Sequence, residues 1–220
     1  MLHAWPLMRF LCISDIHGHA AALRAVIEEG KAREFQQLIV CGDLLFPGPE
    51  PLETWHLLLE HKAVCVQGMS DRAIATVDPK KLKPATPEQR VRLDRLFAAK
   101  QILGDLIVAR LGKLAPVARL PLENGDEMVI VHGSPADPSE PFTPDMTDQE
   151  MSALIGDDPA DLIVCGGSHV PFHHKIDEVN IINVGSVGEA PSGGVAHATL
   201  IDVSKFGMTL EQFEVELVAG

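Results

Sequence analysis

The sequence predicts an α/β fold with a parallel sheet, and three observations support this prediction. Apolar runs of strand length alternate with amphipathic stretches through the first third of the chain, at 9–14, 19–35, 37–43, 51–62 and 63–68. This β-α-β-α-β order is typical of parallel sheet. Apolar residues make up 46% of the chain and charged residues 22%, which is a globular composition. Its 220 residues suffice for one sizeable core and include no linker, so we expect a single domain over residues 1–220.

The middle of the chain predicts a long helix over residues 86–112. Thr86 can cap the first turn, Pro87 suits the first helical position, and Gln89 completes a capping box. Gly104 predicts a break in this helix. We therefore expect a helical pair that covers one side of the sheet.

The second half of the chain predicts further strands with short connections. Asn124 and Gly125 lie between two apolar runs and predict a hairpin. Thr147 and Glu150 form another capping box, for a short helix. The remaining strands are predicted from apolar or alternating runs that contain residues 161–169, 171–175, 180–188, 193–203 and 208–218.

The charge and hydropathy of the chain limit its partners. Asp and Glu number 31 against 18 Lys and Arg, which argues against sequence-independent nucleic-acid binding, where basic contacts to phosphate dominate. A basic cluster at Lys80, Lys81 and Lys83 predicts a solvated loop. No apolar run reaches the roughly 18 residues of a membrane span, and no signal peptide is recognisable. We therefore expect a cytoplasmic protein with no membrane partner, translated from Met1 or Met8; its oligomeric state stays open.

The cysteine pattern predicts buried thiols. The four cysteines form no CxxC pair, and each lies in an apolar run of strand character: Cys12, Cys41, Cys65 and Cys165. We expect small buried side chains in a reducing compartment rather than disulfides or metal ligands.

Polar residues of metal-ligand type close the predicted strands at four places. Asp15 and His17 are two residues apart, so both side chains point the same way from the end of the first strand. Asp43 follows a glycine at the next strand end, and His132 and His169 close two later strands. Singly, the carboxylates could be caps and the histidines hydrogen-bonded loop residues. Because strand ends of an α/β sheet meet at one edge, the set together favours a metal site.

The order of these motifs resembles a known family. DIHG, GD, GMSD, VHG and GxSHVP resemble the calcineurin-like metallophosphoesterases, and NVGSVG followed by ATLID resembles their small YfcE-like phosphodiesterase branch. The resemblance extends from about Met8 to the last strand. It implies a four-layer fold of two mixed β-sheets packed as a sandwich and flanked by helices. It also implies a two-metal centre at the strand ends that hydrolyses phosphomonoesters or phosphodiesters.

The resemblance implies roles for individual residues. Asp15, His17 and His169 match the ligands of the first metal, Asp43 matches the bridging carboxylate, and His132 matches a ligand of the second metal. Asp43, His132 and His169 would be the catalytic residues. The first site offers a nitrogen and oxygen set suited to manganese, iron, zinc, nickel or cobalt. The second site would bind an ion weakly or only with substrate, since even an open zinc site usually has three protein ligands.

Three positions depart from the family pattern, all on one side of the expected site. Met69 and Gly167 stand where the family has an asparagine and a histidine ligand, and Ser70 stands where many members have a histidine that assists the leaving group. Met69 is a poor ligand for a hard ion, so we expect it to pack in apolar surroundings.

Neighbouring polar residues could compensate in part. His19 and Ser168 are candidates to touch metal or phosphate. His173 and His174 are expected to be an exposed strand pair, and Asp71 is expected to cap the following helix.

Three functions follow from these observations. The first is a metal-dependent phosphoesterase that hydrolyses a small phosphomonoester or phosphodiester with a metal-bound hydroxide. The alternative is an impaired or inactive phosphoesterase fold that acts as a binding or scaffold module, as in non-catalytic family members such as the retromer subunit. A third is a metal- or nucleotide-sensing protein. The complete first site favours the enzyme, and the clustered departures favour the scaffold.

Overall fold

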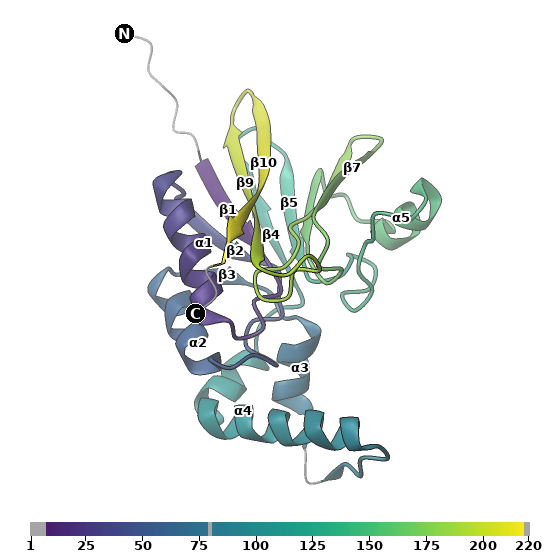
Figure 1. Cartoon of the computed structure of the whole chain (residues 1–220). Coiled ribbons are helices and arrows are strands. Elements are labelled where there is room, and N and C mark those ends of the chain that lie inside the picture. The colour runs from purple at the N-terminus through teal and green to yellow at the C-terminus, as the bar shows by residue number, and fades with distance from the viewer. Residues whose placement is uncertain (1–7, 79–80, 218–220) are drawn as a thin grey trace.

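Two five-stranded mixed sheets form the centre of the computed structural model, which describes residues 8–78 and 81–217 (Figure 1). Two predictions depend in part on residues outside these ranges. The alternative start involves residues 1–7, and the basic-loop prediction includes Lys80. The first sheet has the order β10-β9-β1-β2-β3. Its strands are β1 (Met8–Ile13), β2 (Gln37–Val40), β3 (Val64–Cys65), β9 (Val195–Ser204) and β10 (Gly207–Glu216). β1, β2 and β3 are parallel, as predicted, and β9 and β10 are antiparallel additions.

The second sheet has the order β4-β5-β6-β8-β7. β5, β6 and β8 are parallel, whereas β4 and β7 pair antiparallel at the two edges. The predicted hairpin at Asn124 and Gly125 joins β4 to β5. The strands are β4 (Val117–Pro121), β5 (Glu127–Val131), β6 (Leu162–Cys165), β7 (Phe172–Ile176) and β8 (Val179–Asn183).

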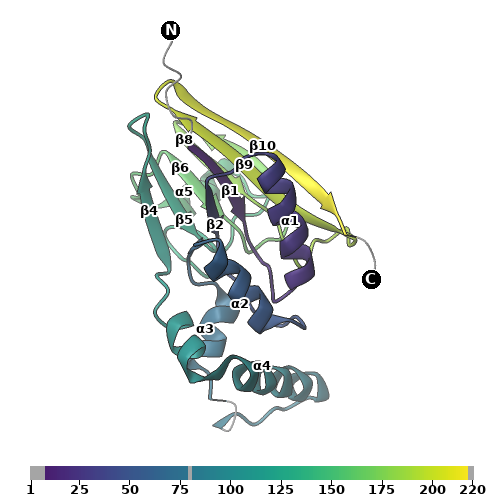
Figure 2. The ribbon, with the colours of Figure 1, turned by 90° about the vertical axis from the view of Figure 1, so that its left-hand side faces the viewer.

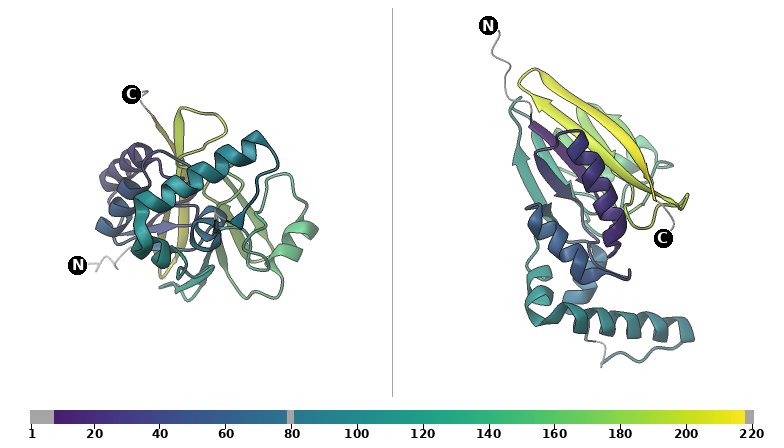
Figure 3. Two further views of the ribbon diagram at one scale, coloured as in Figure 1. Left: turned by 90° about the horizontal axis from the view of Figure 1, so that it is seen from below. Right: turned by 60° about the vertical axis from the view of Figure 1, so that its left-hand side comes forward.

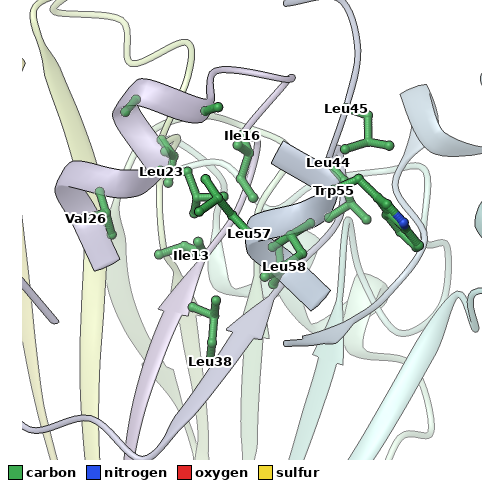
Figure 4. Close-up of a cluster of buried hydrophobic side chains, with 14 of the residues drawn as sticks. Ile13, Ile16, Leu23, Val26, Leu38, Leu44, Leu45, Trp55, Leu57 and Leu58 are labelled. Carbon is green, nitrogen blue, oxygen red and sulfur yellow. The ribbon is translucent and has the colours of Figure 1, made fainter. Parts of the chain in front are cut away.

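The two sheets pack face to face over a shared apolar core, with helices outside. Side chains of both sheets meet in one buried cluster, which includes Cys12 and Ile39 from one sheet and Ile130 and Val164 from the other. The outer face of the first sheet packs on α1 (Ala20–Ala32) and α2 (Pro51–Glu60), where Leu23 and other apolar residues are buried (Figure 4). The outer face of the second sheet packs on α5 (Asp148–Ile155). This sandwich with flanking helices confirms the predicted fold.

The long helix α4 (Pro87–Leu111) begins and breaks as predicted but lies elsewhere. Thr86 caps it by accepting from the Gln89 amide, although the Gln89 side chain accepts from Ala85 rather than from Thr86. Gly104 interrupts the helix with φ 70°. The pair packs on α3 (Met69–Thr76) and α2, beyond the strand ends (Figures 2 and 3). The expected cover over the sheet is therefore wrong, because α4 buries only a narrow seam: Leu96, Ala99, Leu103 and Leu111.

The predicted burial of the cysteines holds with one exception. All four thiols are free, and Cys12, Cys41 and Cys165 are buried. Cys65 is only half-buried by residue exposure, because β3 is a two-residue edge strand. Within the described ranges 8–78 and 81–217, the helices are too short or too polar to cross a bilayer.

Candidate metal centre

Four strand ends deliver the five predicted ligand-type residues to one place. Asp15 and His17 follow β1, Asp43 follows β2, His132 follows β5 and His169 follows the turn after β6. Ligand atoms of Asp15, His17 and His169 all lie within 4.8 Å of one another, and so do those of Asp15, Asp43 and His132. Asp15 is common to both groups, so the two sheets jointly form a single centre with two lobes.

The distances within this centre are short for groups that do not bond to one another. His169 Nε2 lies 3.1 Å from Asp15 Oδ1 and 3.3 Å from His17 Nε2. Asp43 Oδ2 lies between the two lobes, 3.9 Å from His17 Nε2 and 3.6 Å from His132 Nε2. Apart from His169, whose side chain is 25% exposed, these groups are nearly or fully buried, so the surrounding water screens them little.

The backbone at the centre is strained in a repeated way. Asp15, His17, Asp43 and His169 all have φ between 51° and 62°, the left-handed region that side chains rarely adopt. Backbone hydrogen bonds hold this geometry, with Asp15 donating to the Gly42 carbonyl at 3.1 Å and His17 donating to the Asp43 carbonyl at 2.9 Å. Strain of this kind gathers at functional sites when the surroundings hold it in place.

Each of the three histidines is anchored through the ring nitrogen that points away from the centre. Nδ1 contacts a backbone carbonyl at 2.6 Å for His17, 2.8 Å for His132 and 3.2 Å for His169; the carbonyls belong to Phe46, Cys41 and Glu189. Because a carbonyl only accepts, Nδ1 carries the proton, and in the neutral ring Nε2 presents a lone pair to the centre. Metal-bound histidines are held in this way by their outer partners.

The donor atoms of the centre suit a cation. Asp15 Oδ1 is buried and accepts no well-formed hydrogen bond from the described residues. Three Nε2 lone pairs and two carboxylates converge here. A cation can bind to these groups, whereas a neutral molecule would leave the carboxylate charges uncompensated. The carboxylates also act on the histidines: contact with Asp15 raises the pKa of His169. Burial opposes charging of His132, but the carboxylates of Asp43 and Asp15 raise its pKa.

The residues at the departing positions lie beside Asp43 and His132. A Cβ atom at Gly167, which has φ +77°, would lie 3.6 Å from His132 Nε2. Met69 opens α3 and is 47% exposed, so the expected apolar packing is wrong: the first turn of α3 faces the cavity rather than the core. The Ser70 amide donates to Asp43 Oδ1 at 2.7 Å.

Asp71 fixes the start of α3, as the sequence predicted. Its carboxylate accepts from the amides of Gly68 and Leu44, each at 3.0 Å. Burial, followed by the charge of Asp43, raises the pKa of Asp71 to about 7.

The candidate auxiliary histidine, His19, is not part of the ligand groups found among the described residues. It precedes α1 and lines a neighbouring hollow, which shares Phe46 and Pro47 with the cavity in front of the centre. The Ser168 hydroxyl lies 3.4 Å from the Val170 amide in its own turn. On β7, His173 is exposed and His174 half-buried, and both bond to surface groups: Asn180 and Asp148.

Sequence reasoning missed Glu189. Its Oε2 lies 3.7 Å from His17 Nε2, and its carbonyl is the acceptor for His169 Nδ1. The available signal was its position after the glycine-led turn that follows β8, which makes it a further carboxylate at a strand end.

A cavity of about 920 Å³ opens in front of the centre. His17, Asp43, His169 and Glu189 line one end of it. Met69 and Ser70 of α3 line its side, and the first half of α4 with the segment before it forms the opposite wall. The centre is thus open to a molecule far larger than an ion.

Comparison with known proteins places these features in a family. The calcineurin-like phosphoesterase superfamily domain matches residues 8–205. An uncharacterized protein of Methanocaldococcus jannaschii is 27% identical over 229 residues, which cover 93% of this chain and 87% of the relative.

Solved structures share the fold. A hypothetical protein from Pyrococcus horikoshii OT3 has a TM-score of 0.78 at 21% identity and covers 96% of this chain and 89% of its own. A metallophosphoesterase from Sphaerobacter thermophilus has a TM-score of 0.75 at 22% identity, with 95% and 89% covered. The phosphoesterase YfcE from E. coli is also similar, with a TM-score of 0.52 at 19% identity over 95% of this chain and 100% of that one.

Proposed function

The chain belongs to the calcineurin-like phosphoesterase superfamily, and on this premise we propose that it is a metal-dependent hydrolase of small phosphate esters. One observation carries the proposal: three Nε2 lone pairs and two carboxylates converge at four strand ends. The strained backbone there, and a buried carboxylate oxygen without a hydrogen-bond partner among the described residues, support it. We also propose that the chain forms one domain, since the two sheets share one core.

The donor set supports a division of the ligands between two ion positions. Asp15, His17 and His169 would hold the first ion, Asp43 would lie between the two positions, and His132 would serve the second. Imidazole and carboxylate donors suit manganese, iron, zinc, nickel or cobalt. A bound ion of this kind lowers the pKa of water and neutralises charge on a phosphoryl group.

The residues differ in their access to substrate. Asp43 and His169 line the cavity and can face a phosphoryl group there. His132 is 4% exposed, so its role is to hold Asp43 and a second ion rather than to touch phosphate. The Nδ1 anchors keep each imidazole oriented, so no side chain has to reorder when a substrate enters.

A binding or scaffold function is the second candidate. Met69 and Gly167 leave the second position with few ligands, and α4 exposes apolar side chains at Val91, Phe97, Ile102 and Leu106. An exposed apolar surface of this kind suits a protein partner.

The test is hydrolysis by metal-stripped protein reloaded with manganese or nickel. The substrates are p-nitrophenyl phosphate and bis(p-nitrophenyl) phosphate, and bound metal per chain is measured on the same sample. We expect Asp43→Ala to lose more than the roughly 10–100-fold that removal of an outer partner costs at metal sites. Asp94→Ala, an exposed carboxylate on α4, is the matched control and should keep full activity. Equal rates for the wild type and Asp43→Ala would refute the enzyme, and absence of bound metal would favour the scaffold.

A further inference from the structure

The cavity in front of the metal centre is lined by two kinds of side chain. Phe46, Met69, Val77, Leu82 and Val91 present apolar surface. Met69, Leu82 and Val91 are between 47% and 53% exposed, which is unusual for large apolar side chains gathered around one hollow. A largely apolar cavity with a few polar groups is typical of small-molecule sites.

The far wall adds positive charge. Lys83, Arg92 and Arg95 line the cavity, and Arg92 and Arg95 lie three residues apart on α4, so they share a face of the helix. Among residues 8–78 and 81–217 no carboxylate forms an ion pair with these three, and the same holds for the exposed Arg72, Arg90 and Arg110; the three differ from those in lining one cavity. Glu88 also lines this wall. Three uncommitted cations around one cavity are notable in a chain of net charge −13.

The mixed lining of the cavity constrains the substrate. One end of the cavity receives the phosphoryl group, as the proposed function requires. Apolar side chains can then cover whatever is esterified to it, and the cations lie beside Leu82 and Val91 on the wall opposite α3. Arginine forks bind phosphate oxygens in pairs, so a second phosphate is the group that they fit best.

We propose that the site takes a phosphodiester whose esterified group is of nucleoside size and carries a second phosphate, held by Arg92, Arg95 and Lys83. This inference rests on the proposed function. In the reaction, water adds to phosphorus, one P–O ester bond breaks, and the released alcohol takes a proton. The second phosphate is unchanged and serves only for recognition. The cavity of about 920 Å³ is large enough for such a molecule.

Two matched substrates test the proposal. One is the p-nitrophenyl diester of thymidylate, and the other is the same diester with an additional phosphate on its free sugar hydroxyl. For the manganese-loaded wild type we expect kcat/KM to be about tenfold higher for the diester with the additional phosphate, a preference of about 1.4 kcal/mol. In Arg92→Gln/Arg95→Gln this preference, measured as the ratio of the two kcat/KM values, should disappear.

Arg90→Gln is the matched control, because Arg90 is an exposed arginine of α4 that does not line the cavity. It should keep the preference, and thermal unfolding checks that all variants are folded. An equal kcat/KM for the two diesters in the wild type, or a preference that survives the double substitution, overturns the inference.

Calorimetry separates this inference from the proposed function. Binding of thymidine bisphosphate and of thymidylate is compared without turnover, and we expect the bisphosphate to bind about tenfold more tightly in the wild type only. Tighter binding without any hydrolysis would sustain the pocket and refute the enzyme. Hydrolysis of both diesters at one rate, with equal binding of the two nucleotides, would sustain the enzyme and refute the pocket.

Discussion

Replacement of Gly167 by histidine should supply the ligand that the second metal position lacks. The Cβ of a side chain at this position would lie 3.6 Å from His132 Nε2, so an imidazole can reach the lobe formed by Asp43 and His132. We expect the Gly167→His protein to bind more metal per chain than the wild type after stripping and reloading.

The substitution has a cost that the structure allows us to calculate. A left-handed side chain costs about 1–2 kcal/mol, and the new Cβ would lie 3.0 Å from Pro141 Cβ and 3.2 Å from the His132 carbonyl oxygen, so these neighbours must shift slightly. A total of about 2 kcal/mol lowers Tm by about 4–8 °C in a chain of this length. When the metal concentration is about 100 times the Kd of the added site, metal binding raises the free energy of unfolding by about 2.7 kcal/mol.

Thermal unfolding with and without metal, combined with elemental analysis, measures both effects. Gly167→Ala is the control, because it has the same Cβ and no ligand atom. In chelator the two variants should lose similar stability, and manganese should stabilise the histidine variant by about 2.7 kcal/mol more than the alanine variant. If both variants respond to manganese alike and bind equal metal, the reasoning about Gly167 is wrong.

Further predictions concern metal, pH and the core. Met69→Asn added to Gly167→His should raise metal stoichiometry and diester hydrolysis together, as measured on one sample; a gain in neither would contradict a second position at Met69. Contact with Asp15 raises the pKa of His169, so its ring takes up a proton at a higher pH than a free histidine does. A protonated ring cannot bind metal, so manganese affinity in a titration should weaken at least about tenfold when the pH falls from about 8 to about 6. Leu23→Ala, in the fully buried α1 face, should lower the free energy of unfolding by about 2–5 kcal/mol in urea.

The parallel pairing of the first three strands and the position of the ligands that follow them were predictable from local pattern. Apolar runs and their periodicity identify β1, β2 and β3, and parallel pairing then forces Asp15 and Asp43 to the same edge. His132 and His169 follow for the same reason in the second sheet.

Other features depend on tertiary contacts that no local pattern encodes. The turn that carries Glu189 is held by Val187 and Gly188 donating to carbonyls of Ser14 and Asp15, far away in sequence. The position of α4 depends on a few buried residues around Leu96. Because α4 also carries exposed apolar residues, its sequence does not indicate which face is buried. For the same reason the cavity wall of Arg92 and Arg95 could not be assigned from the sequence.

The four left-handed residues of the centre have a consequence for stability. Each costs about 1 kcal/mol or more, against a total stability of about 5–15 kcal/mol for a typical domain. Glycine adopts this conformation without that cost, so Asp15→Gly would relieve backbone strain while it removes a carboxylate from the centre. The stability of the fold and the ligand set of the centre therefore oppose one another at Asp15, His17, Asp43 and His169.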